Sequence, residues 1–128
     1  MNICVFGLWH LGSVTSACLA KLGHKVVGLD FDKDVVKGLQ QGKAPLFEPG
    51  LNKLISQQLQ EDRLSFSHDA RESLKRAQVL WFTWDTPINE KDEADIRFLE
   101  SNFKKIMPYL NDGTAIVFFF SSASWFYQ

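Results

Sequence analysis

Two glycines and one aspartate near the start of the chain have the spacing of a site for phosphate and ribose. Gly7 and Gly12 keep the first and third glycines of a G-x-G-x-x-G turn between a strand and a helix. The first glycine makes the tight turn, and the third lets the helix approach the sheet. Asp30 follows about 20 residues later, where a carboxylate accepts hydrogen bonds from ribose hydroxyls. This pattern favours a dinucleotide, and the charge of Asp30 favours NAD because it would repel the 2′-phosphate of NADP.

The second position of the turn departs from this pattern. A glycine there normally lets the pyrophosphate contact bare backbone, and this chain has Trp9 instead. An indole would occupy or reshape that space, which predicts that NAD binds weakly or in a shifted pose. The alternative is that Trp9 fills the groove as part of the core. The residues alone leave both interpretations open.

The elements that would position these residues alternate along the chain. Short apolar runs predict strands at 2–7, 25–30, 63–67, 78–84 and 114–120. Apolar positions three and four apart predict helices at 11–22, 32–41, 51–59, 70–77 and 96–110, and the first helix would bury Leu11, Val14, Cys18 and Leu22. This order predicts an α/β fold, a Rossmann-like, doubly wound and mainly parallel sheet of five to six strands with helices on both faces.

Composition excludes several classes of protein. A chain of 128 residues with 45% apolar side chains is one ordinary domain. Its 14 basic and 15 acidic residues give a net charge of −1, which offers no case for nucleic acid or for a basic membrane patch. The longest apolar run, residues 115–120, is far shorter than the ~20 residues that cross a bilayer. The N-terminus lacks a basic leader, so we expect a cytoplasmic protein.

Other reactive side chains have less specific surroundings. Cys4 and Cys18 lie in apolar segments without the spacing of metal ligands, which predicts two reduced core thiols. We expect His10 to pack rather than to act in acid-base chemistry. The acidic run at 89–93 is typical of a solvated loop, and no metal site is expected there.

Several stretches of the chain resemble the N-terminal domain of the UDP-glucose/GDP-mannose dehydrogenase family. The most specific match is Glu48-Pro49-Gly50-Leu51 after the second βα unit, because generic Rossmann domains lack this run. The other matches are Gly7 to Thr15, Ala17 to Ala20, Leu22 to His24, Val27 to Asp32, Gly42 to Pro45 and Thr86-Pro87. The resemblance covers about residues 1–117 and implies an NAD-binding domain there.

The resemblance also implies an activity for the longer enzymes. The family oxidises the 6-hydroxymethyl group of a nucleotide sugar to a carboxylate with two NAD⁺, through a cysteine-linked thiohemiacetal and thioester. Its nucleophilic cysteine and sugar pocket lie in later domains, outside these 128 residues, and Cys4 and Cys18 do not match that cysteine. We therefore expect this chain to be inactive alone. The alternative is a non-enzymatic, degenerate Rossmann module for nucleotide binding or protein interaction.

The resemblance carries over to individual cofactor positions. Thr86 matches the threonine of the family's Val-Gly-Thr-Pro loop. The family often has a lysine just after the aspartate of the second strand; that position is Val35 in this chain, and Lys33 is nearby. Asp85 replaces the glycine before that threonine, and the indole N–H of Trp9 could donate to its carboxylate. The predicted cofactor-binding residues are Gly7, Leu8, Trp9, His10, Leu11, Gly12, Asp30, Lys33, Thr83, Trp84 and Thr86.

The end of the chain departs from the family. Where the family has a Ser-Ser-Gln-Val-Pro-Val-Gly turn, residues 118–126 hold four phenylalanines and one tryptophan. One permitted set of codons for residues 119–128, read one nucleotide later, encodes Ser-Ser-Gln-Val-Pro-Val-Gly-Phe-Thr. We expect a frameshift near residue 119 that makes 118–128 an aberrant aromatic tail; the alternative is an unusual aromatic edge segment. Exposed aromatic side chains also predict a homo-oligomer or other self-association through this tail.

The gene sequence tests the frameshift. Tryptophan has a single codon, TGG, so Trp125 and the first base of the Phe126 codon must encode glycine in the shifted frame. We expect the codons of residues 119–128 to encode the family turn in that frame, followed by a cysteine-bearing, family-like continuation. Codons that cannot encode the turn, or an unrelated downstream sequence, would contradict the frameshift.

Overall fold

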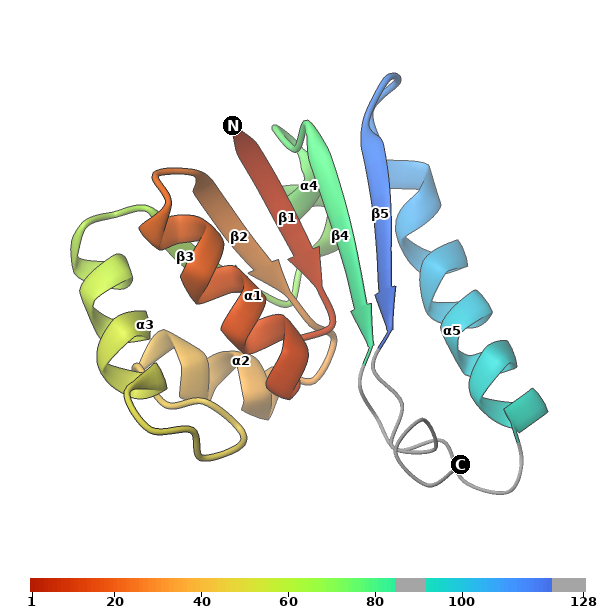
Figure 1. Cartoon of the computed structure of the whole chain (residues 1–128). Coiled ribbons are helices and arrows are strands. Elements are labelled where there is room, and N and C mark those ends of the chain that lie inside the picture. The colour runs from red at the N-terminus through yellow and green to blue at the C-terminus, as the bar shows by residue number, and fades with distance from the viewer. Residues whose placement is uncertain (85–91, 121–128) are drawn as a thin grey trace.

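The computed structural model describes residues 1–84 and 92–120, in which five parallel strands form one sheet (Figure 1). The strands are β1 (Asn2–Phe6), β2 (Lys25–Leu29), β3 (Leu64–Ser67), β4 (Val79–Trp84) and β5 (Ala115–Phe120), in the order β3-β2-β1-β4-β5. The chain builds outward from β1 to β3 and then crosses back to place β4 on the other side of β1. This reversal puts a topological switch point between β1 and β4, at the carboxyl ends of the strands.

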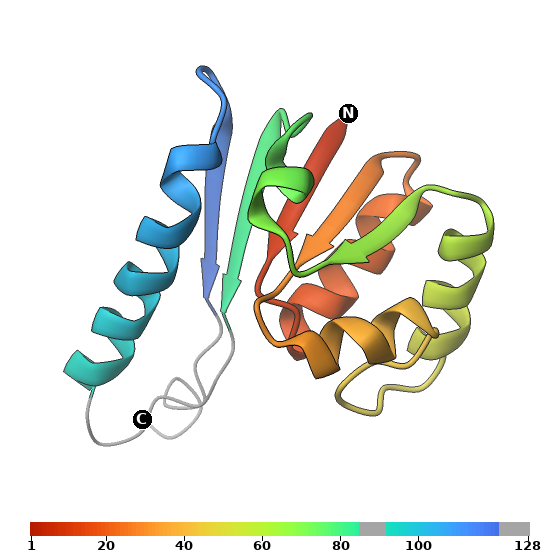
Figure 2. The same cartoon turned by 180° about the vertical axis from the view of Figure 1, so that it is seen from behind.

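Helices cover both faces of the sheet (Figures 1 and 2). One face carries α1 (His10–Lys21), α2 (Lys33–Gln40) and α3 (Leu51–Gln60), and the other carries α4 (Ala70–Leu74) and α5 (Asp92–Ile106). Each face has its own buried core, one including Val5 and Ile55 and the other including Phe82 and Ile106. The predicted doubly wound α/β fold is therefore confirmed, with all five strands parallel.

Local chemistry explains where several helices begin and end. The carboxylate of Asp32 accepts hydrogen bonds from the backbone N–H groups of Asp34 and Val35 and so caps α2. The longest helix begins at residue 92, earlier than the expected 96, and ends at Ile106. Pro108 has no N–H to continue the helix, and residues 107–109 form the short 3₁₀ helix η1 (Met107–Tyr109) instead.

The prediction for the inner face of α1 was wrong at Cys18 and Leu22, whereas Val14 packs, partly buried, against the core. Cys18 is exposed, and Leu22, just after the helix, is 75% exposed. The buried residues of α1 are all small: Gly12, Ser13, Ser16, Ala17 and Ala20. Small side chains let the helix axis lie close to the sheet, where leucine would not fit. Cys4 is a buried thiol in β1 as expected, and Cys18 is not a core residue, although both cysteines are free.

The aromatic segment begins inside the sheet. β5 runs to Phe120, as predicted for the last strand, and Phe118 pairs with Phe82 of β4. The ring of Phe118 lies 5.5 Å from the rings of both Phe82 and Phe103, on the α5 side of the sheet. The predicted domain boundary after residue 117 therefore falls within a strand. The rest of the predicted tail, residues 121–128, lies outside the described residues.

Candidate functional site

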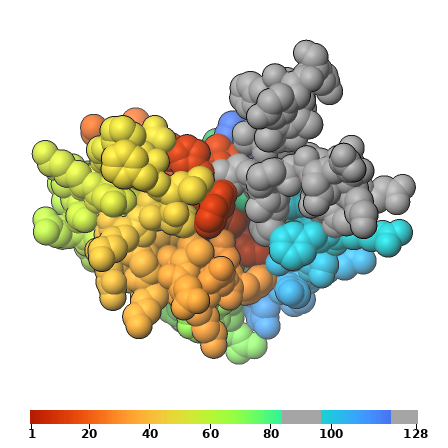
Figure 3. Space-filling model, turned by 90° about the horizontal axis from the view of Figure 1, so that it is seen from below, coloured from red at the N-terminus to blue at the C-terminus, as the bar shows by residue number. Residues whose placement is uncertain are grey.

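A cavity of about 380 Å³ opens at the switch point of the sheet, where β1, β2 and β4 end. Figure 3 looks onto this edge, where the red residues of the β1–α1 turn lie between the orange α2 region and the cyan start of α5. Five of the predicted site residues line it: Gly7, Leu8, Trp9, Asp30 and Thr83. The other lining residues are Asp32, Val35, Asn102, Lys105 and the three phenylalanines Phe6, Phe31 and Phe98. The volume is in the range of small-molecule sites, about 300–1,000 Å³.

The β1–α1 turn is hydrogen-bonded to the end of β2 on one side. The backbone N–H of Gly7 donates to the carbonyl of Leu29 over 2.9 Å. The N–H of Leu8 donates to Oδ2 of Asp30 over 2.8 Å. Gly7 itself has a φ of 97°, which side chains other than glycine rarely adopt. The first glycine of the motif therefore makes the tight turn that the sequence predicts.

Thr83 of β4 holds the same turn from the other side. Its hydroxyl lies 2.7 Å from the carbonyl oxygen of Gly7 and 3.0 Å from that of Phe6, and the side chain is buried. Gly12 of α1 packs against this contact: a Cβ there would overlap the carbonyl oxygen of Gly7 and lie 2.9 Å from the Thr83 hydroxyl. The third glycine thus allows the close approach of helix and turn. Thr83 lines the cavity, but its single hydroxyl proton is donated to the carbonyl oxygens of the turn.

Asp30 is a partly buried carboxylate with two backbone donors. Oδ2 accepts from Leu8, and Oδ1 accepts from the N–H of Asp32 over 2.9 Å. Burial raises the pKa of the Asp30 carboxyl above its usual range, and the N–H donors of Asp32 and Leu8 oppose this shift. The nearby charge of Asp32 raises the pKa further. The two carboxylate oxygens together have about four acceptor positions, so the carboxylate keeps room for a ligand hydroxyl.

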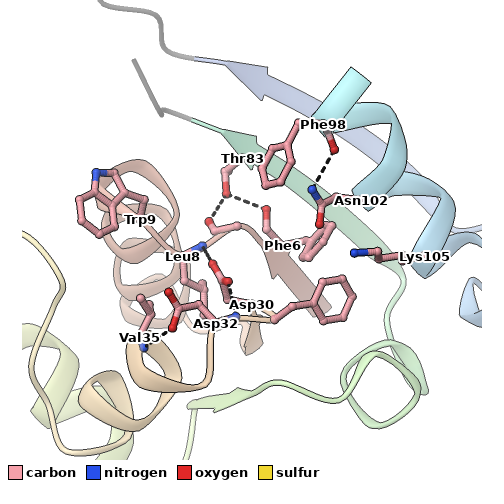
Figure 4. Close-up of a pocket in the computed structure, with 12 residues that line it drawn as sticks. Phe6, Leu8, Trp9, Asp30, Asp32, Val35, Thr83, Phe98, Asn102 and Lys105 are labelled. Carbon is pink, nitrogen blue, oxygen red and sulfur yellow. Dashed lines mark hydrogen bonds between the residues drawn. The ribbon is translucent and has the colours of Figure 1, made fainter. Parts of the chain in front are cut away.

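Trp9 lies at the N-terminus of α1, at the rim of the cavity. It is the N-cap residue, and its carbonyl accepts a hydrogen bond from the N–H of Ser13. The side chain is 39% exposed, so the interpretation that Trp9 is part of the core was wrong. In Figure 4 its indole lies beside α1, on the far side of the cavity from Phe98 and Lys105.

The other predicted site residues lie elsewhere or cannot be placed. The described lining of the cavity does not include His10, Leu11, Gly12 or Lys33. The Nε2 atom of His10 lies 3.5 Å from Oε2 of Glu48, which links α1 to the segment that carries the Glu-Pro-Gly-Leu run. Thr86, the side chain of Trp84 and the proposed pair of Trp9 with Asp85 lie outside the described residues.

Sequence reasoning missed the opposite wall of the cavity. Phe31 and Asp32 follow Asp30 directly, and α5 contributes Phe98, Asn102 and Lys105. The amide of Asn102 donates to the carbonyl of Phe98 over 2.8 Å, and the Lys105 ammonium lies 5.7 Å from the centre of the Phe31 ring. The spacing of these α5 residues shows that they share one side of a helix. It does not show that this side reaches Asp30, because that depends on how α5 docks.

Comparisons with known proteins agree with the fold and the turn. The sequence model of the protein family described as "UDP-glucose/GDP-mannose dehydrogenase family, NAD binding domain" matches residues 1–122. The chain belongs to this family. UDP-glucose 6-dehydrogenase TuaD of Bacillus subtilis is 31% identical over 116 residues, which are 91% of this chain and 25% of that protein. GDP-mannose 6-dehydrogenase of Pseudomonas putida is 32% identical over 114 residues, covering 89% of this chain and 26% of that protein.

Solved structures of family members align with nearly the whole chain. A ternary complex of GDP-mannose dehydrogenase from Pseudomonas aeruginosa has a TM-score of 0.81 at 29% identity, covering 95% of this chain and 28% of that one. UDP-D-ManNAc dehydrogenase from Pyrococcus horikoshii has a TM-score of 0.82 at 25% identity, covering 94% and 28%. The chain thus spans about a quarter of the length of the relatives it matches. Its place in them is the NAD-binding domain.

The tight contact at Gly12 predicts a large cost for one added methyl group. Gly12→Ala would force α1 away from the Gly7 carbonyl and should lower the free energy of unfolding by roughly 1–3 kcal/mol. Gly38→Ala in α2 is the matched control, because its Cβ would come no closer than 3.3 Å to the nearest atom, the Lys43 carbonyl oxygen. Urea unfolding measures both variants. A Gly12→Ala protein as stable as the Gly38→Ala protein would contradict this description of the turn.

Proposed function

We propose that the cavity binds NAD and that the chain serves as the cofactor domain of a nucleotide-sugar 6-dehydrogenase, of the UDP-glucose or GDP-mannose type. The observation that carries the proposal is the position of Asp30. Its carboxylate stands at the end of β2, hydrogen-bonded to the glycine turn, and it still has acceptor positions for ribose hydroxyls. Family membership supports the same ligand.

Four described residues have a defined part in this proposal. Asp30 would orient the adenosine ribose, while Thr83 and Gly12 keep the turn in the shape that Asp30 requires. Asp32 adds a second carboxylate to the same wall, so a 2′-phosphate would meet two negative charges, which favours NAD over NADP. NAD, when bound, supplies the hydride acceptor for the oxidation of the sugar.

Neither cysteine is placed to form a covalent intermediate in the cavity. Cys4 lies inside β1, where burial raises the pKa of its thiol far above its usual range and keeps it protonated. Cys18 is exposed on α1 and is not part of the described cavity lining. We therefore propose that these 128 residues alone bind NAD without oxidising a sugar. The two free thiols suit the reducing cytoplasm, where we propose that the protein acts.

A second candidate function rests on Trp9. An indole at the N-cap of α1, where the motif normally has glycine, favours weakened or shifted binding of NAD. If that weakening abolished binding, the chain would be a non-enzymatic Rossmann module. Affinity for NAD therefore separates the two functions.

Calorimetric titration tests the proposal. We expect NAD to bind more weakly than low micromolar, and NADP to bind more weakly still. Asp30→Asn removes the charged acceptor of the ribose and should reduce NAD affinity about tenfold or more, since hydrogen bonds to charged groups contribute ~1.5–3 kcal/mol. It should also reduce the preference for NAD over NADP.

Asp34→Asn is the control for this titration. Asp34 is an exposed carboxylate in the first turn of α2, and it does not belong to the described lining of the cavity. Its removal should leave NAD affinity unchanged. Equal affinity for NAD and NADP, or no effect of Asp30→Asn, would contradict the assigned role of Asp30. Low-micromolar affinity for NAD would contradict the weakening by Trp9.

We further propose that the protein self-associates through its aromatic segment. β5 is an edge strand without a charged side chain, and Ile116, Phe118 and Phe119 are 38%, 52% and 46% exposed. Natural edge strands normally carry a lysine or another device that prevents pairing with a second sheet. Exposed apolar side chains on such a strand favour association between copies.

Sedimentation velocity over a range of concentrations tests this association. We expect oligomers that grow with concentration, and Phe119→Lys should shift the protein toward monomer because the charge would be buried in the contact. Phe47→Lys, at an 86% exposed residue outside β5, is the matched control and should not change the distribution. A native protein that stays monomeric at high concentration would contradict the proposal.

A further inference from the structure

We propose that the cavity recognises the adenosine half of its ligand and that Trp9 excludes the diphosphate from the N-terminus of α1. In consequence, adenosine and adenosine monophosphate bind this chain as tightly as NAD does. The inference rests on the proposed function, because it assumes that an adenine nucleotide enters this cavity. It goes beyond that function because it specifies which half of the nucleotide contributes to the affinity.

The groups that suit a nucleoside gather at the ends of β2 and α5. The carboxylate of Asp30 keeps acceptor capacity for a ribose hydroxyl. Apolar side chains of Phe31, Val35 and Phe98 line the same cavity and offer surface to a flat base. Asn102 adds an amide whose carbonyl oxygen can accept a hydrogen bond. The described lining therefore offers groups that suit both a ribose and a purine.

The α1 end of the cavity lacks what a diphosphate needs. Phosphates bind at helix N-termini because backbone N–H groups there are bare and point at the anion. Here the N-cap residue itself is Trp9, whose bulky side chain is 39% exposed and belongs to the described lining of the cavity. The N–H groups of Gly7 and Leu8 are already used, by the Leu29 carbonyl and the Asp30 carboxylate.

The charges around the cavity also disfavour a diphosphate at the N-terminus of α1. Asp30 and Asp32 place two carboxylates next to the turn, where they would repel a diphosphate. Among the described residues that line the cavity, Lys105 is the one basic side chain. It extends from α5, on the side opposite Trp9 in Figure 4, and lies near the Phe31 ring. A diphosphate at α1 would thus meet no basic side chain of this lining, and it would have to share the helix end with the side chain of Trp9.

The size of the cavity fits one nucleoside better than a dinucleotide. Its volume of about 380 Å³ lies near the lower limit of small-molecule sites, about 300–1,000 Å³. Loss of the diphosphate subsite would also leave the nicotinamide without an anchor at the turn. The diphosphate and nicotinamide would then contribute little to affinity.

Calorimetric titration with adenosine, AMP, ADP and NAD tests the inference on the native chain and on Trp9→Gly. For the native chain we expect the four dissociation constants to agree within about threefold, a difference under ~1 kcal/mol. Trp9→Gly removes the side chain at the N-terminus of α1 and should increase the affinity for ADP and NAD about tenfold or more, which is ~1.4 kcal/mol. Adenosine should bind both proteins equally.

Phe47→Gly is the matched control, since it removes an 86% exposed aromatic ring that does not belong to the described lining of the cavity. It should change none of the four constants, and thermal melts should show all three proteins folded. NAD binding to the native chain at least tenfold more tightly than adenosine would overturn the inference and leave the proposed function standing. Trp9→Gly without effect on ADP and NAD would overturn it as well. Absence of binding by every adenine ligand, to both the native chain and Trp9→Gly, would overturn the proposed function itself.

Discussion

The structure depends on one short turn after β1 that is held between the two strands flanking β1. Leu8 is hydrogen-bonded to the Asp30 carboxylate at the end of β2, and Gly7 is hydrogen-bonded to the Thr83 hydroxyl of β4. Gly12 lets α1 pack directly onto the same carbonyl of Gly7. These contacts join three parallel strands and the first helix at the switch point of the sheet. The cavity is the space that remains beside this junction.

The same junction explains why the site can change without loss of the fold. Asp30 has a structural role, because its carboxylate accepts hydrogen bonds from Leu8 and Asp32. The same carboxylate also lines the cavity, where it can accept a hydrogen bond from a ligand. Burial makes its charge costly and raises its pKa, and the backbone donors partly offset that cost. Trp9, in contrast, contributes no side-chain hydrogen bond to the cap of α1. A residue at this position can therefore alter ligand binding while the strands, the turn and α1 stay in place.

The sequence predicted the parts of the site that depend on short-range chemistry. Gly7, Gly12 and Asp30 were identified because turn geometry and helix packing restrict the residue types at those positions. The inner face of α1 was misjudged because small residues, which carry little apolar signal, occupy it. The exposure of Trp9 and the α5 wall of the cavity depend on tertiary docking, which residue spacing does not contain. The helix that begins near Asp32 was predicted, but the place of Asp32 in the cavity was not.

Backbone amide NMR during titration with NAD tests the central claim most directly, because it locates the ligand on the protein. The account predicts that the N–H signals of Leu8 and Asp32 shift together and saturate at one NAD concentration, since both N–H groups donate to the Asp30 carboxylate. Signals near Lys75 and Arg76, at the second and larger cavity beside α4, should not move. Shifts confined to that second cavity, or an unchanged Leu8 signal at saturation, would contradict the account.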